Sequence, residues 1–145
     1  YPINLLTVHI SGGMSMLTRA REAAHAIKSK VIGVSLLTSL DQKDVEKVFF
    51  NDIRKVADNL FDLAKEANMD GIVCSAHELK YARTNIPNLL KIVPGIRLSS
   101  DNDDQKRVMS PGEALKLGAN HLVIGRPITE SKHPNAELEK IYETL

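Results

Sequence analysis

Five short apolar runs recur along the chain, and they constrain its fold more than any other feature. Each run is too apolar for a strand with one solvated face, so we expect strands that are buried on both faces. The segments between the runs show helical spacing, most clearly at Val56, Leu60 and Leu63. A strand followed by a helix, repeated about five times, predicts an α/β fold with a parallel sheet. The runs span residues 3–9, 31–37, 71–75, 89–93 and 121–125.

Capping residues support this order of elements. Ser110 can accept from the first turn of a helix, Pro111 needs no N–H at the first helical position, and Glu113 completes a capping box. Gly118 is then expected to end that helix. Ser75 and Glu78 form a second candidate box, which places Ser75 where a strand passes into a helix.

Size and charge restrict the class of protein. With 145 residues and 43% hydrophobic content, the chain can bury one modest core, so we expect a single domain or part of one. Its 19 basic and 18 acidic residues nearly cancel, which argues against a nucleic-acid platform or a polybasic membrane anchor. A lone Cys74, with no partner for a disulfide, fits a reducing cytoplasm. No apolar run approaches the ~20 residues that span a bilayer, and the histidines show no metal-site spacing.

A glycine and an arginine follow the last apolar run. The strand breaks at Gly125 and then presents Arg126, so a main-chain N–H and a guanidinium can reach one point beyond the strand end. Such donors suit an esterified phosphate. On spacing alone, a turn glycine beside an arginine that pairs with a surface carboxylate explains the pattern equally well.

Three other polar features of the sequence could have a functional or a structural role. Thr38 ends an apolar run and could hydrogen-bond a base edge, although a helix cap by the Thr38–Ser39 pair is the commoner role, with Ser39 the better cap. The stretch 98–105 is rich in Ser, Asn and Asp, which predicts an irregular loop that either contacts a ligand or is simply solvated. His9 is expected to be a hydrogen-bonded core residue.

Six runs together resemble the bacterial type of orotidine 5'-monophosphate decarboxylase, in that family's order and at roughly its spacing. The resemblance covers essentially the whole chain and implies a TIM (β/α)8 barrel, of which the chain would supply about strands four to eight with their helices. The runs are residues 7–13, 34–39, 71–76, 94–97, 104–111 and 122–129.

The resemblance also implies a function and a set of substrate-binding residues. The family converts orotidine 5'-monophosphate to UMP in pyrimidine biosynthesis, without a metal or an organic cofactor, as a cytoplasmic homodimer. By position, Gly125, Arg126, Arg97 and Gln105 would hold the phosphate, while Pro94 and Thr38 would contact the pyrimidine. The loop before Gln105 is about one residue shorter than in typical members, which affects the reach of that side chain.

The decarboxylating lysine of the family lies in an Asp-x-Lys-x-x-Asp motif, and no lysine of this chain has aspartates at both of those offsets. We therefore expect residues 1–145 to be the C-terminal portion of one barrel domain, without a catalytic residue of its own and inactive alone. Its sheet edges would be unpaired, which predicts association or aggregation. Two alternatives stay open: a related barrel enzyme that acts on a sugar phosphate, and a non-catalytic half-barrel that needs a partner chain.

Overall fold

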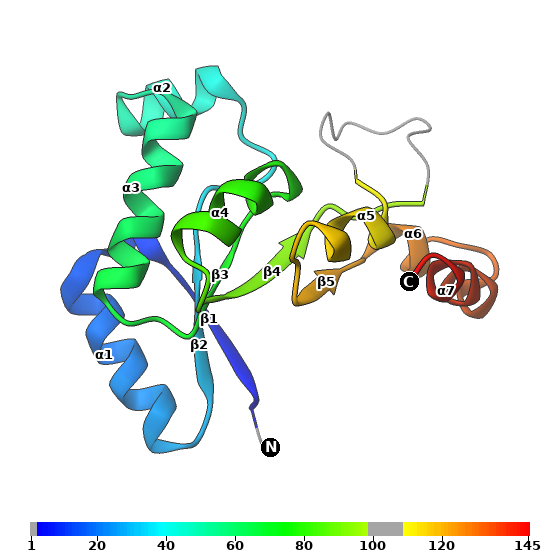
Figure 1. Cartoon of the computed structure of the whole chain (residues 1–145), viewed down its shortest axis with the longest axis horizontal. Helices are drawn as coiled ribbons and strands as arrows, with labels where there is room; N and C mark the ends of the chain where they lie inside the picture. The colour runs from blue at the N-terminus through cyan, green and yellow to red at the C-terminus, as the bar shows by residue number, and fades with distance from the viewer. Residues whose placement is uncertain (1–2, 99–108) are drawn as a thin grey trace.

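The computed structural model describes residues 3–98 and 109–145. Five parallel strands form one sheet, and they lie in the sheet in the order in which they occur in the sequence (Figure 1). All five coincide with the predicted apolar runs, which confirms the α/β class and the partial barrel. The strands are β1 (Leu5–His9), β2 (Lys30–Val34), β3 (Gly71–Val73), β4 (Leu90–Pro94) and β5 (His121–Val123).

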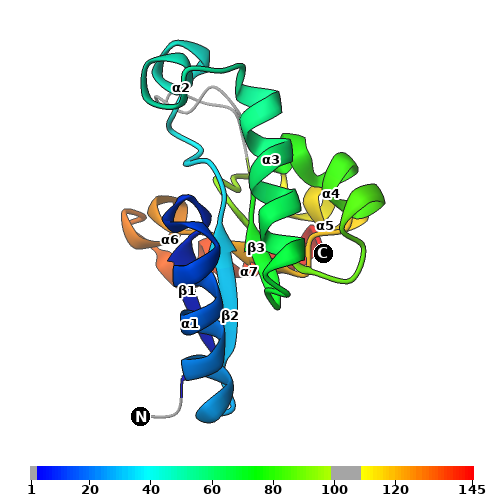
Figure 2. The same ribbon diagram turned by 90° about the vertical axis from the view of Figure 1, so that its left-hand side faces the viewer.

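Helices follow every strand. α1 packs against β1 and β2, and α3 packs against β3 (Figure 2). None of the helices in the described part of the chain is long and apolar enough to cross a membrane. The helices are α1 (Gly13–Ala26), α2 (Gln42–Phe49), α3 (Ile53–Glu66), α4 (Leu79–Asn85), α5 (Pro111–Lys116), α6 (Arg126–Thr129) and α7 (Pro134–Glu143), with 3-10 turns η1 (Ile10–Gly12) and η2 (Ala76–Glu78).

The two faces of the sheet differ in their burial. Strand residues alternate between faces, and the register places Val31, Ile72 and Val93 on one face. These three side chains are fully buried and belong to the core cluster formed with the helices. The opposite face carries Ile32 and Ile92. Both are buried, but neither belongs to the core cluster that the helices form with the first face. We call this second face the inner face, because it would line the interior of a closed barrel.

The predicted capping box at the start of α5 is confirmed. The Glu113 backbone N–H donates to Ser110 Oγ at 3.4 Å, and the Ser110 backbone N–H donates to the Glu113 carboxylate at 3.2 Å. Hydrogen bonds from the Ser110 hydroxyl and N–H hold the pKa of Glu113 below its usual value. Ser75 likewise donates its N–H to Glu78 at 2.7 Å and leads into η2, as expected.

A glycine is required where β3 meets β4. A Cβ built on Gly71 would lie 2.7 Å from the backbone oxygen of Leu90 and 2.9 Å from Cδ1 of Ile32. The backbone of β4 cannot yield without loss of sheet hydrogen bonds, so Gly71→Ala should lower the free energy of unfolding by about 1–3 kcal/mol. This cost exceeds the gain of about 0.4–1 kcal/mol from a stiffer unfolded chain. Chemical denaturation measures the change, and an unaltered or raised midpoint would contradict the close contact.

Candidate functional site

The carboxyl ends of β4 and β5 bring three predicted site residues to one edge of the sheet. Pro94 is the last residue of β4 and pairs in register with Val123 of β5. Gly125 and Arg126 follow Val123 by two and three residues. Because neighbouring parallel strands end at the same edge, Pro94 lies beside the segment that carries Gly125 and Arg126.

Arg97 lies at the base of the predicted loop. Its backbone N–H donates to the carbonyl of Met109 at 3.2 Å, and Ile96 forms a parallel bridge with the same residue. These contacts bring together the two chain segments that flank residues 98–108. Gly95 precedes them with φ +75°, a left-handed conformation that glycine adopts without strain. Gln105, the remaining predicted phosphate ligand, lies outside the described residues.

Gly125 faces open space. A Cβ built on it would meet no heavy atom of the described chain within 4 Å, and the residue is exposed. Its carbonyl accepts from the N–H groups of Ile128 and Thr129 at 2.9 and 3.0 Å, which anchors the short helix α6. Arg126 begins that helix and is half-buried. A ligand can therefore approach the main chain here, as the phosphate hypothesis requires.

Thr38 lies in a turn after β2, and residues on both sides of it form hydrogen bonds. Leu40 donates its N–H to the carbonyl of Leu37 at 3.1 Å, and the buried Ser35 donates its hydroxyl to the carbonyl of Val73 at 2.8 Å. The expected cap at Ser39 was wrong, because Asp41 caps α2 in a reciprocal box with Asp44. The role of Ser35 was missed, since a serine inside an apolar run gives no local signal of its partner.

His9 does not behave as the expected core residue. It ends β1 on the inner face, in register with Val34, and it is exposed. The reason is that β1 is an edge strand of the described sheet, so no neighbouring strand covers it. Another histidine, His25, makes a side-chain contact that we did not predict from the sequence. Its Nε2 lies 2.8 Å from the carboxylate of Asp70, which also accepts a hydrogen bond from the Val31 N–H.

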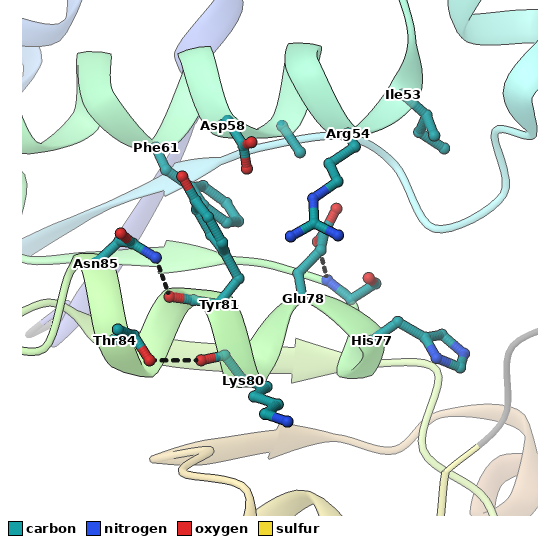
Figure 3. Close-up of a pocket in the computed structure, with 12 residues that line it drawn as sticks. Ile53, Arg54, Asp58, Phe61, His77, Glu78, Lys80, Tyr81, Thr84 and Asn85 are labelled. Atoms are coloured by element: carbon teal, nitrogen blue, oxygen red, sulfur yellow. Dashed lines mark hydrogen bonds between the residues drawn. The ribbon is translucent and has the colours of Figure 1, made fainter.

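Two cavities lie away from the carboxyl edge of β4 and β5. One, of about 590 Å³, runs between α3 and η2–α4 (Figure 3). The other, of about 620 Å³, lies near the amino ends of β2 and β4, and neither is lined by a predicted site residue. In the described residues, no group of three His, Cys, Asp or Glu side chains could hold a metal ion.

The cavity beside α3 has mixed charges and aromatic packing. The Arg54 side chain lies over the ring of Tyr81, with its Cζ 5.8 Å from the ring centroid. Phe61 packs against the same ring, and the two ring centroids are 6.1 Å apart (Figure 3). Loss of hydration, together with the charge of Asp58, raises the pKa of Tyr81. The lining carries both cations and carboxylates, so its charge does not favour an anionic ligand such as a phosphate.

Cys74 should be chemically inert in the folded protein. It is 1% exposed, and burial, assisted by the charge of Glu78, raises its pKa to about 12. Between pH 7 and 9 the folded thiol should hold about a thousandfold less thiolate than a free cysteine, so alkylation by iodoacetamide should be slower by at least that factor. Its contribution to stability is complete below pH 9 and declines as the pH rises toward 12. Mass spectrometry measures the labelling, unfolding in guanidinium should abolish the protection, and rapid labelling of folded protein would contradict the burial.

Comparison with known proteins agrees with this geometry. The model of the orotidine 5'-phosphate decarboxylase / HUMPS family matches residues 1–141. An orotidine 5'-phosphate decarboxylase of Ehrlichia chaffeensis is 45% identical over 143 residues, which are 96% of this chain and 62% of that protein. One from Wolbachia pipientis is 41% identical, over 99% of this chain and 64% of that protein.

A solved structure gives the same result. The orotidine 5'-phosphate decarboxylase from Lactobacillus acidophilus superposes with a TM-score of 0.81 at 30% identity, over 99% of this chain and 63% of that one. The chain thus spans somewhat less than two thirds of the length of each of these relatives.

Proposed function

The chain belongs to the orotidine 5'-phosphate decarboxylase / HUMPS family, and we propose that it forms the phosphate- and base-binding part of an enzyme that decarboxylates orotidine 5'-monophosphate to UMP. The observation that carries the proposal is the meeting of Pro94, Gly125 and Arg126 at the carboxyl edge of β4 and β5. In barrels of this type the active site lies at that edge, and the phosphate site often follows strands seven and eight.

Each predicted residue has a role in this proposal. Arg126 offers two parallel donors to the phosphate, and the open main chain at Gly125 adds an N–H. Arg97 and Gln105 complete the phosphate site. Pro94 and Thr38 contact the pyrimidine ring, Pro94 by apolar contact and Thr38 by its hydroxyl.

The chemical step needs a group that this sequence does not contain. During decarboxylation the bond from the ring carbon to the carboxylate breaks, carbon dioxide leaves, and a proton is added to that carbon. In the family a lysine of the Asp-x-Lys-x-x-Asp motif gives this proton. Residues of the present chain act by binding the remote phosphate, whose binding energy can stabilise the transition state. We further propose that the intact enzyme is a cytoplasmic homodimer and uses neither metal nor organic cofactor.

A turnover assay tests the division of roles. The 145-residue chain, shown by intact mass under denaturing conditions to be the only polypeptide present, should bind UMP but release no carbon dioxide from orotidine 5'-monophosphate. A full-length protein that carries the motif should do both. Turnover by the chain alone would contradict the assignment of the proton donor, and absence of UMP binding to the full-length protein would contradict the proposed function.

A sugar-phosphate enzyme is the second candidate, favoured by the Gly125–Arg126 pair, which would serve any phosphate ester. Competition distinguishes the two. If the full-length protein binds nucleotide, UMP should displace a labelled nucleotide far better than a pentose phosphate does. The reverse order would favour the sugar phosphate.

A further inference from the structure

Ser35 follows the last residue of β2 and lies three residues before Thr38. Although serine is polar, Ser35 is only 6% exposed, and its hydroxyl donates to the carbonyl of Val73 at 2.8 Å. The same carbonyl accepts from the backbone N–H of Ser35 at 3.2 Å. Two donors of one residue thus hold the start of the Thr38 turn against the end of β3.

The strand that accepts these bonds is itself bonded to β4. Val73 is the last residue of β3 and pairs in register with Ile92, and the next residue, Cys74, donates its N–H to the Ile92 carbonyl at 3.1 Å. Pro94 follows Ile92 by two residues and ends β4. A path of hydrogen bonds and strand backbone therefore joins the Thr38 turn to Pro94, the other residue that we propose to contact the pyrimidine.

Two other bonds of the turn are local. Leu40 donates its N–H to the Leu37 carbonyl at 3.1 Å, and Asp41 caps α2 by accepting from the Asp44 N–H at 3.0 Å. Both bonds lie within residues 37–44, so they shape the turn without joining it to a neighbouring strand. The hydroxyl of Ser35 differs, because its partner lies 38 residues further along the chain.

We propose that Ser35 is a positioning residue for the pyrimidine site, whose hydroxyl fixes the Thr38 turn relative to β3 and Pro94. This role rests on the proposed contact between Thr38 and the base. Ser35 is buried and its hydroxyl already donates to Val73, so it acts through the turn and does not touch the ligand. Site residues must be held within about 0.5 Å of the productive geometry, and supporting hydrogen bonds provide that precision.

Loss of the hydroxyl should loosen the turn without opening the sheet. In Ser35→Ala the backbone N–H can still donate to the Val73 carbonyl, so the strand pairing remains. Thr38 then samples more positions, and ligand binding has to order it. The proposed phosphate-binding residues Gly125 and Arg126 follow β5, which is separated from β2 by two strands, so the phosphate contacts should not change.

Binding of two ligands to the full-length enzyme tests this role. Ser35→Ala should weaken the binding of UMP about three- to tenfold, the scale of one hydrogen bond. Ribose 5-phosphate, which lacks the pyrimidine, should bind the variant and the parent protein equally. Ser35→Thr keeps the hydroxyl and should restore the affinity for UMP. If Ser35→Ala does not fold, Ser35→Thr and Ser35→Val give the same comparison, because they differ by a hydroxyl against a methyl group.

A matched serine lies at the other end of β2. Ser29 precedes the strand, is 2% exposed, and donates its hydroxyl to the carbonyl of Ile3. It has the same residue type, burial and kind of partner as Ser35, but it lies at the amino end of the strand, away from the proposed site. Ser29→Ala should therefore lower the denaturation midpoint and leave the Kd of UMP unchanged.

A double variant separates positioning from a general loosening of the protein. Thr38→Val removes the hydroxyl that we propose to bind the base. When Ser35→Ala is added to it, the affinity for UMP should fall no further, because no contact is left to position.

Four results would overturn the role of Ser35. They are an unchanged affinity of Ser35→Ala for UMP, equal losses for UMP and ribose 5-phosphate, an equal loss with Ser29→Ala, and a full additional loss in the Thr38→Val protein. In each case the parent protein still binds UMP, so the decarboxylase proposal stands. If the parent protein does not bind UMP, the decarboxylase proposal fails, and the role of Ser35 fails with it.

Discussion

In a full-length enzyme carrying this sequence, Arg126→Ala should weaken the binding of UMP by about 2–4 kcal/mol, which is roughly 30- to 1000-fold in Kd. Arg126 is half-buried at the start of α6, beside an exposed glycine whose main chain a phosphate can approach. Its loss removes charge-assisted hydrogen bonds that a neutral side chain cannot replace. Isothermal titration calorimetry measures the difference.

Three controls restrict the interpretation of this experiment. Arg126→Lys keeps the charge but loses the parallel donors, so an intermediate loss is expected. Uridine, which lacks the phosphate, should bind both proteins with the same affinity. Arg19→Ala removes an arginine that is 83% exposed and pairs with Glu22, and it should leave UMP binding unchanged. Equal UMP affinity of Arg126→Ala and the parent protein would show that Arg126 does not bind the phosphate.

Phe61→Ala should cost about 3–5 kcal/mol of unfolding free energy in the 145-residue chain. Phe61 is 1% exposed, lies in the core cluster, and packs against Tyr81 between α3 and α4. Truncation removes the burial of the ring and leaves a cavity that the sheet and helices cannot fill. Because whole domains are stable by only about 5–15 kcal/mol, the variant should unfold at a much lower denaturant concentration.

The chain offers a control of the same residue type. Phe50 is 89% exposed at the end of α2, so Phe50→Ala should change the stability by less than about 0.5 kcal/mol. Similar losses for the two variants would contradict the burial assigned to Phe61. A gain of stability with Phe50→Ala would not contradict the burial of Phe61.

Features that depend on near neighbours in the sequence were predicted correctly. The strands, the Ser110–Glu113 box and the passage from strand to helix at Ser75 all arise from residues within a few positions of one another. The prediction of Ser39 as the cap of α2 was wrong. Ser39 and Asp41 both have side chains that can cap a helix, and composition does not rank them. The predicted burial of His9 was wrong for another reason: burial depends on whether a strand lies beside β1.

The sequence by itself determined the alternation of strands and helices, the family, and the candidate residues Thr38, Pro94, Arg97, Gln105, Gly125 and Arg126. Only the tertiary structure decided which face of each strand meets the helices, that Pro94 lies beside the Gly125 segment, and that β1 and β5 are the outermost strands of the sheet in the described residues. The physical reason is that propensity and periodicity act over a few residues, whereas strand pairing and burial join residues that are tens of positions apart.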